Sequence, residues 1–191
     1  MDRAMNSLLW VEQGYQLFAQ EGLEGIQVER LARILQLNKS GFYHYFGDLE
    51  GFCAQLVALH LDKVDLFLEG IRQCKRVDPD YLLLLARSAT TVMFQVQLTR
   101  NKEHYSFYKT SEVVDERLHR TVHKLWSEFI GAQHNPDLSM RYFVIVRDMF
   151  YTRISFDNLN YKFLHDFAAN AKGLIDQIAV QASHERSRSH D

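Results

Sequence analysis

The sequence has few of the residues that interrupt or cross-link a chain. Its 191 residues include two prolines, nine glycines and two cysteines. So few helix-breaking residues, with apolar side chains at helical rather than alternating spacing, predict an all-α chain. Cys53 and Cys74 are too few for a disulfide framework, which indicates a reducing compartment.

Long apolar runs and a targeting segment are lacking as well. The longest apolar runs, such as those at 81–86 and 142–146, fall far short of the roughly 20 residues that span a bilayer. The beginning of the sequence has no basic head, apolar run and small-residue cleavage site of a signal peptide. We therefore expect a soluble, cytoplasmic protein that has no membrane partner.

Motifs for catalysis are scarce. The sequence has no glycine-rich phosphate loop, no nucleophile elbow and no Cys-x-x-Cys pair. Its only Glu-x-x-His pair is Glu116 with His119, whereas a di-iron bundle would need that motif twice and two more glutamates. The sequence thus predicts neither an enzyme nor a cofactor.

The most informative stretch is residues 26–46, IQVERLARILQLNKSGFYHYF. Four apolar residues of its first part fall on one helical face: Val28, Leu31, Ala32 and Leu35. Leu37 then falls in a turn, and Phe42 and Phe46 supply the inward face of a second short helix. This pattern predicts a helix-turn-helix.

The second of these helices carries outward polar and aromatic residues. Asn38 precedes it and is expected to be its N-cap. A short helix presented in this way fits the major groove of double-stranded DNA. The predicted DNA-binding residues are Gln27, Arg30, Asn38, Lys39, Ser40, Tyr43 and His44.

At these residues the chain resembles the TetR family of bacterial transcriptional repressors. The resemblance rests on the leading helix at 8–21, on Gly22, Val28 and Leu31-Ala32, and on the 39–46 segment. It implies a three-helix DNA-binding domain at 1–47, a larger helical ligand-binding and dimerisation domain at 48–183, and a polar tail at 184–191. It also implies a homodimer on a palindromic operator, released by a small-molecule inducer.

The chain departs from the family pattern at four positions. Members often carry Thr or Ser where this chain has Gln27 and Gly41, Gly where it has Gln36, and Lys where it has Leu49. Residues 1–50 hold four Lys or Arg and seven Asp or Glu, a net charge of −3. A basic excess is usual in a domain that grips phosphate, so we expect modest and salt-sensitive DNA affinity.

Beyond residue 46 the sequence predicts a series of longer helices. Their expected spans are Asp48 to about Arg76, Asp78 to about Leu98, a short helix around Tyr105–Tyr108, Ser111 to near Gly131, Asp137 to about Phe156, and Tyr161 to about Ala182. The tail from Ser183 is polar and is expected to be disordered.

The last two helices carry aligned apolar residues. Such stripes fit either the core of one protomer or a four-helix bundle formed by a two-fold axis, and the family resemblance favours the dimer. The predicted interface residues are Phe143, Phe150, Ile154, Phe167, Leu174 and Ile178.

The middle helices contain bulky residues that could line an apolar ligand site. Aromatic residues at helical spacing are more often plain core. The predicted ligand-binding residues are Phe94, Tyr105, Tyr108, Trp126 and Met149.

One polar stripe on these helices has the spacing of metal ligands. Glu116, His119 and His123 share a helical face with Glu112, and a His pair one turn apart beside a carboxylate can hold a transition metal. His104 is the obvious further ligand. A solvated face of carboxylate–histidine pairs is the more common meaning of this pattern.

Together these features predict a transcriptional regulator, most simply a repressor, whose operator affinity is controlled by a small molecule of unidentified structure. The alternative is a homodimeric small-molecule-binding protein whose head binds DNA weakly or not at all. A helical metal-dependent enzyme has much less support.

Overall fold

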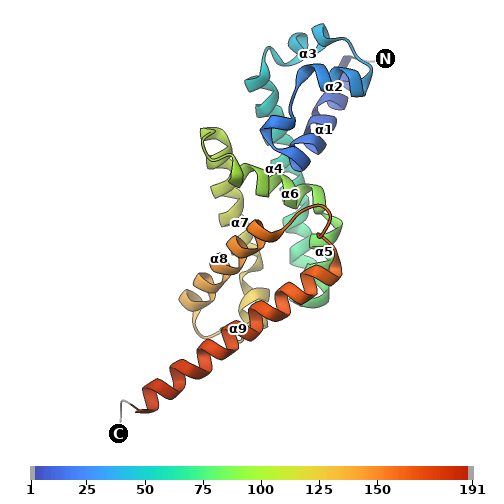
Figure 1. Cartoon of the computed structure of the whole chain (residues 1–191). Helices are drawn as coiled ribbons and strands as arrows, with labels where there is room; N and C mark the ends of the chain where they lie inside the picture. The colour runs from blue at the N-terminus through green and yellow to red at the C-terminus, as the bar shows by residue number, and fades with distance from the viewer. Residues whose placement is uncertain (1–2, 189–191) are drawn as a thin grey trace. The chain divides into compact units, whose positions relative to one another are not determined.

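The computed structural model describes the backbone of residues 3–188 and the side chains of residues 5–178. These residues form helices α1 to α9 and two short helical turns, with no β-strand among them (Figure 1). The all-α prediction is confirmed. Within the described part of the chain, no helix has the length and apolar character needed to cross a bilayer.

The chain divides into two compact units. The first contains the chain up to Glu69 together with Ser88–Arg117. Its elements are α1 (Arg3–Glu21), the 3₁₀ turn η1 (Leu23–Gly25), α2 (Val28–Leu35), α3 (Lys39–Phe46), most of α4 (Leu49–Gln73), α6 (Ala89–Arg100) and the first half of α7 (Tyr105–Phe129).

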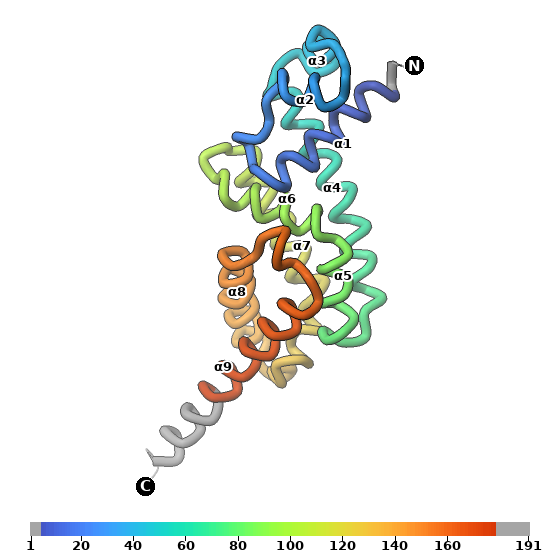
Figure 2. Tube along the Cα trace, turned by 45° about the vertical axis from the view of Figure 1, so that its right-hand side comes forward, coloured from blue at the N-terminus to red at the C-terminus, as the bar shows by residue number. Residues whose placement is uncertain are grey.

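The second unit contains Gly70–Arg87 and the chain from Leu118 onward. Its elements are the end of α4, the π-type turn η2 (Val77–Tyr81), α5 (Leu82–Arg87), the second half of α7, α8 (Pro136–Arg153) and α9 (Tyr161–Arg188). Helices α8 and α9 lie side by side in Figure 2, and the ring centroids of Phe150 and Phe167 are 5.7 Å apart.

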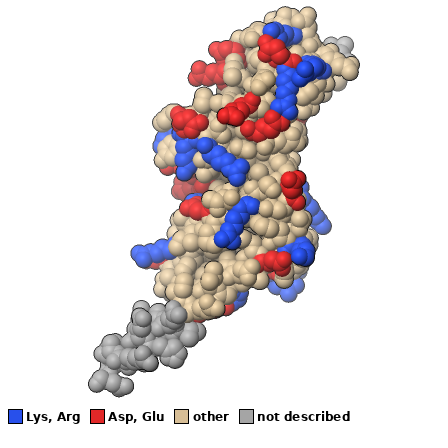
Figure 3. All heavy atoms as spheres, viewed as in Figure 1, with Lys and Arg blue, Asp and Glu red and all other residues tan. Residues whose placement is uncertain are grey.

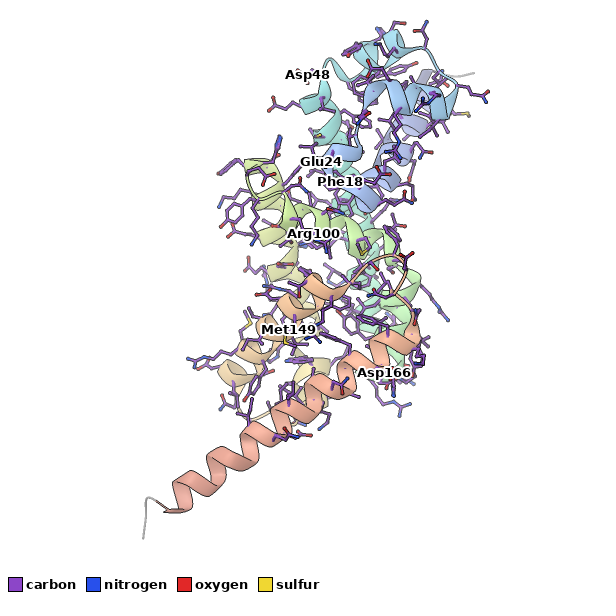
Figure 4. The ribbon with its side chains drawn as sticks, in the orientation of Figure 1. Phe18, Glu24, Asp48, Arg100, Met149 and Asp166 are labelled. Carbon is purple, nitrogen blue, oxygen red and sulfur yellow. The ribbon has the colours of Figure 1, made fainter. Side chains whose placement is uncertain are left out.

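Stacked aromatic rings form the core where α1 meets α6. Phe94 of α6 is fully buried, and its ring centroid lies 4.3 Å from that of Tyr15 and 4.4 Å from that of Phe18. Phe18, labelled in Figure 4, lies on the side of α1 that packs against α6. Aromatic pairs at these separations stabilise a fold beyond the area they bury.

The predicted helix starts at Asn38 and Asp48 are confirmed by their hydrogen bonds, and α8 begins one residue before its expected start at Asp137. The Asn38 side chain accepts from Ser40 N at 3.1 Å and caps α3, while Asp48 Oδ1 accepts from Gly51 N at 2.8 Å at the start of α4. Asn135 caps α8 by accepting from Leu138 N at 3.1 Å. Each side chain satisfies an amide that the first helical turn leaves without a partner.

Other boundaries differ from the predictions. The expected helix at 78–98 is interrupted at Ser88, whose φ of −100° and ψ of 27° separate α5 from α6. The expected break before Ser111 is absent, because Ser111 Oγ donates to Tyr108 O at 2.8 Å within a continuous α7. Helix α9 continues to Arg188, past its expected end, and 189–191 lie outside the described residues.

His60 is a buried histidine in the first unit, and burial lowers its pKa to about 4. An unfolded histidine titrates near pH 6.5, so below that pH the unfolded chain binds a proton that the folded chain does not. Stability therefore falls as the pH decreases from about 6.5 to about 4. We predict that His60→Gln, which cannot titrate, flattens this part of the stability curve by up to about 3 kcal/mol.

Urea unfolding between about pH 4.5 and pH 7 measures this effect. The matched control is His134→Gln, a change of the same kind at an exposed position, which should leave the slope of the parent unchanged. Equal pH dependence in the parent and the His60 variant would contradict the prediction.

Candidate nucleic-acid interface

The predicted helix-turn-helix forms from α2, a tight turn and α3. Gln36 ends α2 in the left-handed conformation, with φ of 55° and ψ of 37°, a region that glycine reaches without steric cost. Its N–H and that of Leu37 return to carbonyls of the last turn of α2. A non-glycine residue therefore makes this turn, at the position where the family often has glycine.

Helix α3 is anchored by Phe42. This ring is fully buried, 5.4 Å from the ring of Trp10 on α1 and 5.0 Å from the ring of Phe52 on α4. Helices α1 and α4 approach closely here, because a Cβ on Gly14 would lie 2.4 Å from Phe52 Cζ. The support beneath α3 is thus rigid and densely packed.

The predicted DNA-binding residues of α3 face outward. Lys39, Ser40 and His44 are exposed, and the Tyr43 side chain is 50% exposed. Gln27, at the N-cap of α2, is exposed as well and donates weakly to Glu24 O at 3.4 Å. Polar groups on an outward helix can reach base edges and phosphates in a major groove.

Carboxylates already pair with two of the cations in this region. Lys39 Nζ lies 2.7 Å from Glu29 Oε1, and both Arg30 Nη atoms contact the Glu21 carboxylate, at 2.5 and 2.7 Å. The hydrogen bond that Lys39 donates to Glu29 raises the pKa of Lys39, and the hydrogen bond that Arg30 donates to Glu21 lowers the pKa of Glu21. Arg33, on the exposed end of α2, has no ion pair among the described residues.

The charge on the visible face of the first unit is correspondingly mixed. In Figure 3, acidic side chains are interspersed with the basic ones in the region where Figure 1 shows α1 to α4. Surface pairs of this kind contribute little to folding and compete directly with phosphate for the same cation.

The other departures from the family pattern are also at the surface. Leu49, 39% exposed at the start of α4, offers no charge to a phosphate. A Cβ on Gly41 would meet only Tyr45 Cε2, at 3.6 Å, so the helix has room for a serine or threonine there. The absence of a hydroxyl at Gly41 is thus not imposed by packing.

The predicted ligand residues occupy different environments. Phe94 belongs to the stacked core of the first unit, where Tyr105 is 74% exposed and Tyr108 donates its hydroxyl to Glu112. The other two lie in the second unit: Trp126 is buried, and Met149, labelled in Figure 4, is half-buried on α8. These five residues are therefore divided between the two compact units.

The metal site predicted from Glu116, His119 and His123 does not form. Within the described residues, no group of three His, Cys, Asp or Glu side chains is placed to hold a metal ion. The rings of His119 and His123 lie edge to face at 5.5 Å, but His119 also packs on Phe143, with 5.3 Å between ring centroids. Among the described residues, His119 therefore packs against aromatic rings and is not joined by a further metal ligand.

The predicted interface residues divide into two groups. Phe143 and Phe150 on α8, and Ile154 at its C-cap, are buried within the protomer itself. On α9, Leu174 is 53% and Ile178 50% exposed, while Phe167 is half-buried against Phe150. The inward face of α9 is a different stripe, formed by Leu164, Ala171 and Ile175. Leu174 and Ile178 of α9 thus lie on the surface of the protomer.

Helices α2 and α3, with their turn and their rigid support, define a helix-turn-helix domain, a class of fold that binds DNA. Residues 11–55 match the family of bacterial regulatory proteins of the tetR type. The match covers most of α1, the whole of α2 and α3, and the start of α4.

A solved structure described as that of a TetR-family transcriptional regulator from Mesorhizobium loti MAFF303099 has a similar fold. It covers 94% of this chain and 98% of its own, with a TM-score of 0.60 at 13% identity. No curated protein matches the sequence at a significant level. The structural likeness shows the fold of the chain, whereas the family match covers residues 11–55. Both findings agree with the predicted resemblance.

The Lys39–Glu29 pair yields a prediction for DNA binding. Glu29→Gln should release Lys39 for a phosphate, tighten binding to duplex DNA several-fold and steepen the dependence of log Kd on log salt by about 0.9. A salt titration by fluorescence anisotropy measures both quantities.

Glu24→Gln is the matched control, because it removes the same charge from an exposed position without an ion pair among the described residues. A control that tightens binding as much as Glu29→Gln would show that only the overall charge matters. Unchanged binding in both variants would place Lys39 outside the interface.

Proposed function

We propose that this protein is a homodimeric transcriptional repressor that binds a palindromic operator and releases it when a small molecule binds the second unit. The observation that carries the proposal is the exposed polar face of α3, held by the buried Phe42 on a rigid support. A helix-turn-helix dimer reads two half-sites about one helical turn, or roughly 34 Å, apart.

Each α3 would enter a major groove with different contacts for register and sequence. Tyr43 and His44 are suited to position the DNA backbone, because both are exposed with polar tips. Lys39, at the first turn of α3, can reach a phosphate or a guanine edge once it leaves Glu29. Asn38 and Ser40 share the capping hydrogen bond, which presents the helix start to the DNA.

The exposed apolar stripe of α9 supports the homodimer. Leu174 and Ile178 lie four residues apart on one helical face, and Phe167 extends this face by two turns. Exposed apolar side chains aligned in this way gain free energy when a second copy covers them, and a two-fold axis pairs the stripe with itself.

Two unsatisfied polar atoms support ligand binding in the second unit. His119 Nε2 and Ser139 Oγ are buried without a hydrogen-bond partner among the described residues. Both residues neighbour the same aromatic pair: Phe143 packs against His119 and Trp126, and Trp126 Nε1 donates to Ser139 O at 3.0 Å. A compact aromatic molecule with a hydroxyl or carbonyl group would satisfy such atoms.

The alternative function is a homodimeric small-molecule-binding protein with weak or lost DNA binding. The observations that favour it are the ion pairs at Lys39 and Arg30, the lack of a hydroxyl at Gly41 and the exposed Leu49.

Selection from a random duplex library, followed by a salt titration of the best binder, tests the two functions against each other. We predict an enriched palindrome whose affinity falls as the salt concentration rises. No enrichment at low salt would overturn the repressor and favour the ligand-binding dimer.

For the dimer, we predict that Leu174→Glu converts the protein to monomer at micromolar concentration, because it places a charge in an apolar interface. Light scattering after gel filtration gives the mass. The matched control is Leu66→Glu on α4, where the leucine is 75% exposed, and it should stay dimeric. A parent that is already monomeric would contradict the proposed dimer.

For the ligand, we predict that phenol or acetophenone shifts the fluorescence of Trp126 in a Trp10→Phe background and raises Tm. Ser139→Ala or His119→Phe should weaken this binding about tenfold, because each removes one hydrogen bond. Toluene, which lacks a polar group, is the control probe. Equal effects of toluene and phenol, or unchanged affinity in both variants, would contradict the proposed ligand site.

A further inference from the structure

A continuous series of buried and half-buried hydrogen bonds, here called the hydrogen-bonded chain, crosses the first unit. The Tyr15 hydroxyl lies 2.9 Å from His60 Nδ1, and His60 Nε2 lies 3.1 Å from Gln95 Oε1. Gln95 Nε2 then donates to Asp115 Oδ1 at 2.9 Å and to Ser111 O at 3.2 Å. These side chains come from α1, α4, α6 and α7 in turn, so four helices share one polar connection.

The acceptor groups on α7, at one end of the hydrogen-bonded chain, determine which atom donates in every link. The Asp115 carboxylate and the Ser111 carbonyl only accept, so the amide nitrogen of Gln95 faces them and its oxygen faces His60. His60 must then carry its proton on Nε2, which leaves Nδ1 to accept from the Tyr15 hydroxyl. One end of the chain thus fixes the tautomer in its middle and the hydroxyl orientation at the other end.

Stacking on Phe94 holds the chain in place. The Phe94 ring lies 4.3 Å from the Tyr15 ring and 4.5 Å from the His60 ring, nearly parallel to Tyr15 at 9°. Tyr15, His60 and Gln95 are all buried, where an unpaired polar group is costly. Breaking one link therefore disturbs the others.

Helix α1 extends this connection to the recognition helix. Tyr15 lies five residues after Trp10 on α1, and the Trp10 ring packs edge to face on Phe42 of α3. Phe42 is the buried anchor of α3. A continuous set of contacts therefore runs from Asp115 on α7 to the helix that faces DNA.

We propose that the chain Tyr15–His60–Gln95–Asp115 couples α7 to the recognition helix, with His60 as the positioning residue that fixes α1 and, through Trp10 and Phe42, α3. This inference rests on the proposed DNA-binding function. An apolar core would fill the same space without unpaired groups to satisfy, and polar cores retained against that simpler solution often mark functional elements.

The first test reads the direction of the chain by nitrogen NMR of labelled histidine near pH 7. We expect His60 in the parent to show a protonated Nε2 and an unprotonated Nδ1. A parent with the proton on Nδ1 would overturn the proposal, because His60 Nε2 and Gln95 Oε1 would then both be acceptors and the hydrogen bond between them could not form.

The second test breaks these hydrogen bonds at Gln95 on α6, so that no residue of α1 or α3 is changed. Gln95→Met keeps a long apolar side chain but removes both amide links. Gln97→Met is the matched control, because Gln97 is also a buried glutamine on α6 but takes no part in the hydrogen-bonded chain. Hydrogen exchange of the α3 amides and the Kd for duplex DNA are measured for both, with Tyr15→Phe and the double variant beside them.

We expect Gln95→Met to accelerate exchange in α3 and weaken DNA binding about tenfold each, because the lost hydrogen bonds no longer help to hold α1 and, through it, α3. Tyr15→Phe should have the same two effects. The double variant should change both quantities by less than the sum of the single variants, because both substitutions break the same hydrogen-bonded chain. Unchanged α3 exchange in Gln95→Met, or equal effects of Gln97→Met, would overturn the coupling. A merely structural role would lower global stability without these local changes.

The exchange and NMR measurements need no DNA, so the coupling and the proposed function can fail separately. If the parent binds no duplex but α3 responds to Gln95→Met and not to the control, the coupling stands and the DNA-binding function is wrong. If the parent binds DNA and the exchange of the α3 amides is unchanged in both variants, the function stands and the coupling is wrong.

Discussion

The packing of α1 between two aromatic clusters is the constraint on which the rest of the first unit depends. Trp10 meets Phe42 near the start of the helix, while Tyr15 and Phe18 stack on Phe94 further along. Because an α-helix is stiff over this length, the two clusters cannot move independently. Residue 47 therefore does not mark the end of a compact unit. Helix α6 and the first half of α7 belong to the same compact unit as α1 to α3.

The sequence predicted best those features that are set by neighbouring residues. The caps at Asn38 and Asp48 follow from side chains that bond amides two or three residues away. Ser88 and Ser111 were misjudged because apolar spacing continues across the first, and the second bonds its own helix rather than capping a new one. Local pattern alone cannot distinguish a capping serine from one satisfied inside a helix.

The candidate site was predicted in its outline but not in its electrostatics. The exposed face of α3 follows from the inward positions of the buried Phe42 and the half-buried Phe46, which the spacing predicts. The pairing of Lys39 with Glu29 depends on the angle at which α2 and α3 cross, since these residues lie ten positions apart. The hydrogen bond between Tyr15 and His60 likewise depends on how two helices pack, because these residues lie 45 positions apart in the sequence. Stripes on α8 and α9 looked alike, yet only tertiary packing buried Phe143 and left Leu174 exposed.

The paired cations bear on how a regulator of this kind would be switched. Contacts to phosphate add affinity for every sequence alike, whereas base-edge contacts discriminate between sequences. A head whose Lys39 and Arg30 are engaged by its own carboxylates gives up mainly the sequence-independent part. The proposed operator complex would then be only modestly stable, and a ligand would need a smaller difference in affinity between the bound and released states to displace the protein from DNA. Weaker phosphate contacts would thus make the proposed operator complex easier to release.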